Sequence, residues 1–194
     1  MCTILATSIR EYLDKNEKPA NIPEEGSFVI MVNLRQTPTD SLEMKYGHNL
    51  NHGELVKMPL SGDFEKSLGR IQEQMTDFKN SNKHFMFAAA VKIGSLLFPT
   101  LIKDTQMDTI YRSMRVHLTN LCGSEEPLKF GDSALTKEIL FYTYTEGHHY
   151  NTIELCICSH RGTLKMNLSA AKMKVDPRDI LGIMERKLET LMTQ

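Results

Sequence analysis

Residues 152–170, Thr-Ile-Glu-Leu-Cys-Ile-Cys-Ser-His-Arg-Gly-Thr-Leu-Lys-Met-Asn-Leu-Ser-Ala, decide the fold class of this 194-residue chain. Dense apolar and β-branched runs over 152–159 and 163–170 predict two strands. His160-Arg-Gly162 between them fits a tight hairpin, because glycine adopts the positive backbone angles that short turns need. This part of the chain is therefore expected to be an antiparallel strand pair.

The pattern on either side of the hairpin predicts a mixed sheet flanked by helices. Further strands are expected over 27–35, 47–60, 116–122 and 137–145, of which the first is apolar enough to be a central strand. Helical spacing predicts helices over 2–15, over 64–79 after a cap offered by Ser61-Gly-Asp63, from about 84, over 104–113, and after the Asp176-Pro177 start signal. The order of helix, two strands, helices, meander and helix predicts an α/β (α+β) sandwich, with residues 1–194 as a single domain.

Composition indicates which classes of partner and which cellular compartment to expect. With 41% apolar residues the chain can build a core, and its net charge of −1 gives no overall field that would concentrate nucleic acid or anionic lipid. Cys2, Cys122, Cys156 and Cys158 form no C-x-x-C pair, so reduced thiols inside a cell are expected, with Cys156 and Cys158 as small buried apolar residues on one strand face. Nothing in the first ten residues predicts export. We expect an intracellular protein without a metal site.

Residues 85–102, Phe-Met-Phe-Ala-Ala-Ala-Val-Lys-Ile-Gly-Ser-Leu-Leu-Phe-Pro-Thr-Leu-Ile, raise the question of lipid contact. The stretch has the length of a membrane span, but Lys92, Gly94, Ser95 and Pro99 interrupt it. Two interpretations remain: a buried core helix, or an amphipathic segment that places its apolar face against a lipid surface or an apolar substrate.

The histidines give no enzyme signature by themselves. His148-His149 lies in a turn-like segment, where a pair of solvated side chains is the simpler interpretation than a general base. His48 and His52 are four apart, but Gly47 and Gly53 favour turn and strand over the helix that a zinc pair would need. The sequence holds no G-x-S-x-G elbow, phosphate loop or dinucleotide fingerprint.

Several short motifs, taken in order, resemble the C-terminal half of the wax ester synthase/acyl-CoA:diacylglycerol acyltransferase family. The most specific are Leu-Thr-Asn-Leu-Cys-Gly-Ser at 118–124 and Glu-Pro-Leu-Lys-Phe-Gly at 126–131, which are similar to the family's Ser-Asn-Val-Pro-Gly-Pro and the Pro-Leu-x-x-x-Gly that follows it. Cys122 and Ser124 replace its two prolines. Weaker matches lie at 5–13, 31–35, 47–49 with 58–60, 158–164 and 175–177. Together they span essentially the whole chain.

The resemblance implies a chloramphenicol acetyltransferase-like half, in which two similar halves meet around a tunnel. The family's catalytic His-His-x-x-x-Asp-Gly belongs to the other half, and His148-His149 is not followed by Asp-Gly, so no catalytic residue is carried over. The resemblance makes Asn120 and Gly123 candidates for the substrate channel. It gives structural roles to Asn33, Arg35, Ser159 and Gly162.

Two functions follow from the resemblance. The chain is either the acceptor-side, channel-side half of an O-acyltransferase that makes wax esters or triacylglycerol, or a stand-alone half-domain that binds lipid or a partner without catalysis. In the first, acyl-CoA is a substrate, a long-chain alcohol or diacylglycerol is the acceptor, and no cofactor is needed. A lone half should expose the apolar face that its counterpart covers, so an N-terminal half or a second copy is expected. Location is cytoplasmic or peripheral at a membrane or lipid-droplet surface.

Overall fold

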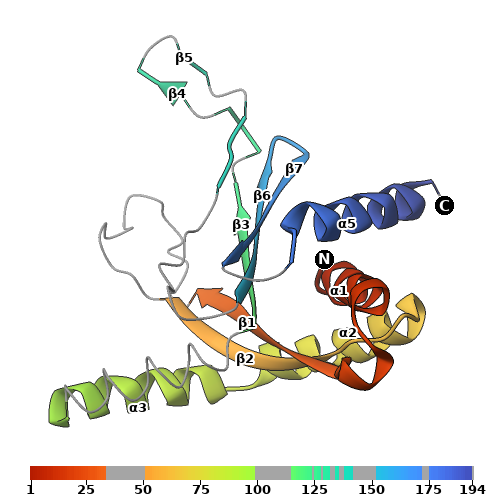
Figure 1. Ribbon diagram of the computed structural model, residues 1–194. Helices are drawn as coiled ribbons and strands as arrows, with labels where there is room; N and C mark the ends of the chain where they lie inside the picture. The colour runs from red at the N-terminus through yellow and green to blue at the C-terminus, as the bar shows by residue number, and fades with distance from the viewer. Residues whose placement is uncertain are drawn as a thin grey trace.

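The computed structural model describes residues 1–33, 51–98, 115–123, 125–127, 129–131, 134–135, 138–141, 152–171 and 175–193. In chain order the elements are α1 (Cys2–Asn16), the short 3-10 helix η1 (Pro19–Asn21), β1 (Glu25–Asn33), β2 (Asn51–Pro59), α2 (Phe64–Asn80), α3 (Lys83–Leu97), β3 (Val116–Cys122), β4 (Lys129–Phe130), β5 (Ala134–Leu135), β6 (Thr152–His160), β7 (Thr163–Ala171) and α5 (Pro177–Met192). Helices α1, α2 and α5 gather on one side of the larger sheet, whereas α3 extends past its β2 edge (Figure 1).

The larger sheet has five strands in the order β2-β1-β3-β6-β7. The outer pairs, β1 with β2 and β6 with β7, are antiparallel, while β1 with β3 and β3 with β6 are parallel. The predicted mixed sheet with flanking helices is therefore confirmed, and so is β1 as an internal strand. Strands β4 and β5 form a separate small sheet.

The expected meander is confirmed for the β6–β7 hairpin but is wrong for β3 and β6. Strand β6 lies beside β3 in parallel, and a parallel pair requires a crossover connection instead of a tight turn. The strand predicted over 137–145 is also wrong where it can be compared, because residues 138–141 take no strand conformation and the rest lie outside the described residues. An apolar run alone does not reveal which neighbour a strand will pair with.

Strand alternation builds the core on the face that meets the helices. Register places Phe28, Val116 and Ile153 in one row across β1, β3 and β6, and Leu118 and Leu155 in another. These residues are buried together with apolar side chains of α1, α2 and α5: Ile4, Leu5, Ile9, Ile71, Ile180, Ile183 and Met184. Burying such side chains away from water is the main force that holds helices on a sheet.

Both capped helices begin where the sequence places their start signals. The Asp63 side chain accepts a hydrogen bond from the Lys66 N–H at 3.1 Å, and that of Asp176 accepts one from the Arg178 N–H at 2.9 Å. Each carboxylate thereby satisfies one of the amides left without a partner at a helix N-terminus. Arg178 also holds the pKa of Asp176 below its ordinary value through its side-chain hydrogen bond.

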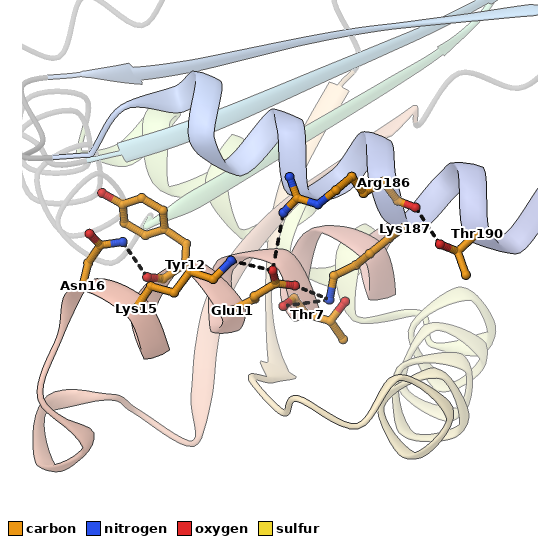
Figure 2. A network of polar contacts seen from close by, with 8 residues as sticks. All are labelled: Thr7, Glu11, Tyr12, Lys15, Asn16, Arg186, Lys187 and Thr190. Atoms are coloured by element: carbon orange, nitrogen blue, oxygen red, sulfur yellow. Dashed lines mark hydrogen bonds and ion pairs between the residues drawn. The ribbon is translucent and has the colours of Figure 1, made fainter.

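Glu11 of α1 joins this helix to α5 (Figure 2). Its Oε1 lies 2.8 Å from Lys15 Nζ and 3.5 Å from Arg186 Nη2, and its Oε2 lies 3.3 Å from Lys187 Nζ. Lys187 Nζ also donates to the Thr7 carbonyl at 3.3 Å. The hydrogen bond from Lys15, followed by that from Lys187, lowers the pKa of Glu11.

Helix α3 settles one of the alternatives left open by the sequence. Its side chains at 86, 93, 96 and 97 are exposed, so the interpretation of this stretch as a buried core helix is wrong for the described residues. No helix in the described ranges is long and apolar enough to cross a membrane. The helix expected over 104–113 lies outside the described residues, as do His48 and His148-His149, while His52 lies in β2.

Candidate functional site

The carboxyl end of β3 carries Asn120, one of the residues singled out by the resemblance. Asn120 lies in register with Ile157 of β6, which in turn lies opposite Met166 of β7. Ile157 is buried and Met166 is half-buried, but Asn120 is exposed. An amide that can both donate and accept hydrogen bonds thus stands at the edge of an apolar row. In open α/β sheets, ligands bind outside the carboxyl ends of parallel strands.

Gly123, which follows β3 directly, is in contact with Ser159 near the end of β6. The Gly123 N–H donates a hydrogen bond of 2.8 Å to the Ser159 carbonyl oxygen. A Cβ on residue 123 would overlap that oxygen, so only glycine permits this approach of the backbones. The Gly123 amide is already used in this backbone hydrogen bond, whereas the Asn120 side chain is exposed at this strand end.

Gly162 lies in the turn that joins β6 to β7. The His160 and Thr163 pair closes the ladder, and the two residues between them, Arg161 and Gly162, have φ values of 51° and 72°. Two positive φ values are the mark of the turn type that suits a two-residue hairpin. The predicted hairpin is confirmed, and Gly162 supplies the backbone conformation on which it depends.

Of the two remaining structural candidates, the structure describes Asn33. Asn33 is the last residue of β1 and pairs with Asn51 of β2, while Arg35 lies outside the described residues. Strand β1 pairs in parallel with β3, so Asn33 lies toward the same sheet edge as Asn120, three residues beyond the last β1–β3 register pair, Ile30 with Leu118. Asn120, Gly123 and Ser159 are the candidates that the fold places next to each other.

A buried polar pair, His117 with Glu154, was missed by the sequence analysis. His117 Nδ1 lies 2.9 Å from Glu154 Oε1 across the parallel β3–β6 pair, where the two residues are register partners. The Glu154 side chain is only 2% exposed. Within the described part of the chain, His117 Nε2 is buried without a hydrogen-bond partner.

This pair has the geometry that orients an imidazole. When Nδ1–H donates to a carboxylate, Nε2 of the neutral ring is the nitrogen that can accept a hydrogen bond. The same sheet face carries Thr119, Cys156, Cys158 and His160, all buried, as expected for the two cysteines. Among the described residues, no three His, Cys, Asp or Glu side chains gather closely enough to hold a metal ion.

A signal for the pair does exist in the sequence. Glu154 lies on the strand face opposite Ile153, Leu155 and Ile157, and it shares that face with Cys156 and Cys158, for which burial is expected, so a charged residue there has to find a partner. His117 occupies the equivalent position between Val116 and Leu118. What the sequence lacks is the parallel β3–β6 register, without which the partner of Glu154 cannot be identified.

The described residues form an α+β domain built on a mixed five-stranded sheet. The family described as WS/DGAT C-terminal domain matches residues 53–192, which is more than half of the chain. The chain therefore belongs to the C-terminal domains of the wax ester synthase/diacylglycerol acyltransferase family. No curated protein and no solved structure matches it significantly.

Proposed function

We propose that the chain is the acceptor-side, channel-side half of an O-acyltransferase that makes wax esters or triacylglycerol from acyl-CoA. The observation that carries the proposal is the family match over residues 53–192, which includes the whole Asn120–Ser159 region. The catalytic histidine comes from an N-terminal half that carries His-His-x-x-x-Asp-Gly. The acceptor is a long-chain alcohol or diacylglycerol, and it is met at a membrane or lipid-droplet surface.

The reaction needs one base and no separate cofactor. The histidine of the N-terminal half removes the proton of the acceptor hydroxyl as its oxygen attacks the thioester carbonyl carbon. A C–O bond forms, the carbonyl oxygen becomes an oxyanion, and collapse of this intermediate breaks the C–S bond. The proton then passes to the leaving thiolate of coenzyme A, which balances the step.

Asn120 is the residue of this chain that we assign to the reacting centre. Its exposed amide stands at the carboxyl end of β3, and its N–H can donate to an oxyanion. Met166 and the exposed Leu164 continue the same sheet face on β7 and supply apolar surface for an acyl chain. The exposed Leu121 follows Asn120 in sequence on the opposite face. This placement of one amide among apolar side chains suits an ester or thioester with a long tail.

A second candidate, a stand-alone half-domain that binds lipid without catalysis, is favoured by a specific observation. Helix α3 presents large apolar side chains to solvent, among them Met86, Ile93 and Leu96. Exposed apolar patches of this kind mark interaction sites irrespective of any catalytic motif.

One experiment separates the two candidates. The complete natural polypeptide that contains this chain is purified, its mass is measured, and transfer of a long-chain acyl group from acyl-CoA to a long-chain alcohol or to diacylglycerol is assayed. The proposal expects turnover, from one polypeptide or from a complex with an N-terminal half. Bound lipid without turnover in either form would instead make the chain a binding protein.

Asn120→Ala tests the role of the residue inside an active preparation. Removing a donor to an oxyanion typically lowers kcat by about 100-fold or more, and KM for acyl-CoA should change little. Asn80→Ala is the matched control, because Asn80 is an exposed asparagine at the end of α2. Equal turnover in the two variants would remove Asn120 from the reacting centre.

A further inference from the structure

The exposed side of α3 is apolar over a continuous arc. Met86, Ile93, Leu96 and Leu97 are all exposed, with Leu96 at 77% and Met86 at 72%. At 3.6 residues per turn they lie on one side of the helix, together with the exposed residues Phe85, Ala89 and Ala90. We call these seven residues the α3 outer face, and it spans roughly 140° of the helix circumference.

The charges of α3 lie at the two borders of this face. Lys83 and Lys92 are exposed, and at the same helical spacing one falls at each edge of the α3 outer face. The helix Lys83–Leu97 contains no aspartate and no glutamate. A lysine at the border of an apolar face can lay its aliphatic stem along that face and hold its ammonium beside a negative headgroup.

Helix α5 does not share this arrangement of an exposed apolar face with lysines at its borders. Helix α5 is similar in length, but Ile180, Ile183 and Met184 pack into the core and its exposed residues carry charges of both signs. Helix α3 touches the edge strand β2 and extends beyond the sheet, away from α1 and α5 (Figure 1). The α3 outer face is therefore exposed to solvent at the β2 edge of the described fold.

We propose that the α3 outer face binds an anionic phospholipid surface, with the helix lying in the interface plane. A wholly cationic helix with lysines at both borders complements negative headgroups, while its apolar side chains enter the boundary of the acyl region. The helix docks on the surface and does not span it. The proposal does not require the acyltransferase reaction, because it rests on exposure and charge alone.

Vesicle flotation with the full chain tests the proposal. Vesicles of phosphatidylcholine alone are compared with vesicles of phosphatidylcholine and phosphatidylserine at low salt. Wild type should float with the anionic vesicles and be released by added salt. Lys83→Gln with Lys92→Gln should weaken the partition coefficient roughly 30-fold, because each lysine near an anionic surface contributes about fivefold.

The apolar part is tested by Leu96→Gln with Leu97→Gln. Both side chains are exposed, so the fold should survive, and circular dichroism checks it. The pair should lower the partition coefficient by at least about tenfold. Met192→Gln is the matched control, because Met192 is 83% exposed at the end of α5, and it should leave binding unchanged.

A spectroscopic variant keeps the test independent of the loss-of-binding variants. The chain has no tryptophan, so Leu97→Trp introduces a single tryptophan, in the α3 outer face, whose emission can be excited apart from that of the tyrosines. Its emission should shift to shorter wavelength with anionic vesicles and be quenched by brominated lipid. Met192→Trp should show neither change.

Three results would overturn the proposal: wild type that stays in the soluble fraction with both vesicles, equal losses in the Leu96/Leu97 pair and the Met192 control, or fluorescence of the Leu97→Trp variant that does not change with lipid. Loss of a dimer in the Leu96/Leu97 pair, without vesicle binding by wild type, would assign the face to a second copy. Binding is measured without acyl-CoA, so an inactive chain that floats supports this proposal while contradicting the proposed reaction.

Discussion

Strands β3 and β6 carry two faces that are both buried but differ in chemistry. On one face Leu118, Leu155 and Ile157 pack under the helices, and on the other His117 meets Glu154. Apolar burial is favourable by itself, whereas a buried carboxylate has to be compensated by partners. The first face therefore accounts for stability. The second face lowers stability unless its polar groups stay paired.

The largest effect expected from this comparison is that of His117→Ala. Removing the imidazole takes a close partner from a carboxylate that is only 2% exposed, and such losses amount to about 3 to 5 kcal/mol of unfolding free energy. Urea unfolding followed by circular dichroism measures the change.

The double variant His117→Leu with Glu154→Leu is the control for this prediction. Replacing both partners of a buried pair by apolar side chains is often close to neutral. If the single variant loses less than about 1 kcal/mol, the pair is not stabilised as a unit and the contrast between the two faces fails.

Leu155→Ala probes the apolar face one residue further along β6. Leu155 is fully buried, and truncating a buried leucine removes transfer free energy and leaves a cavity, at a cost of about 3 kcal/mol. The same urea titration measures it. Leu164→Ala, at an exposed position of β7, should stay within about 0.5 kcal/mol of wild type. Similar losses in both would mean that this face is not packed as described.

Gly123→Ala tests the close contact between the end of β3 and Ser159 of β6 at the candidate site. The new Cβ would overlap the Ser159 carbonyl oxygen, so the backbones have to separate, and we expect a loss of about 2 kcal/mol. Gly69→Ala in α2 is the matched control. Outside the backbone of its own helix, no atom lies within 4 Å of its Cβ position, and helix propensity should make it stabilising by about 0.5 to 1 kcal/mol. A neutral Gly123→Ala would contradict the close approach of β3 and β6.

The comparison also explains how much could be predicted from the sequence. The helices α1, α2 and α5, the β6–β7 hairpin and both aspartate caps follow from local patterns, because apolar spacing and turn residues act within a few positions. The burial of Cys156 and Cys158 follows for the same reason. The parallel pairing of β3 and β6 does not, because it depends on contacts between residues far apart in the chain.

The candidate site was predictable to a similar degree. Asn120, Gly123 and Ser159 were found through motif order, and the fold brings them to one strand end. The contact between the Gly123 amide and Ser159 was not predictable, since it requires the strand register. His117 and Glu154 were missed for the same reason. The exposure of α3 was left open by its sequence, because an apolar run can pack on a core or on a lipid surface.

The smallest effect concerns Glu11, which joins α1 to α5. Its pKa is lowered from the ordinary 4.5, first by the hydrogen bond from Lys15, so the folded state binds a proton there less readily than the unfolded chain. The stabilisation is therefore complete above about pH 4.5 and is lost as the pH falls through the lowered pKa. Because the side chain is 36% exposed and screened by water, we expect less than about 1 kcal/mol.

Unfolding free energies of wild type and Glu11→Gln, measured between about pH 3 and pH 7, give this contribution as a difference. The difference should be largest near neutral pH and vanish at the acid end, and added salt should reduce it. Lys187→Met removes one of the cations in Figure 2, so the same difference should shrink in that background. A difference that is constant over the pH range would mean that Glu11 acts through packing instead of charge, and that α1 and α5 are held by their apolar faces alone.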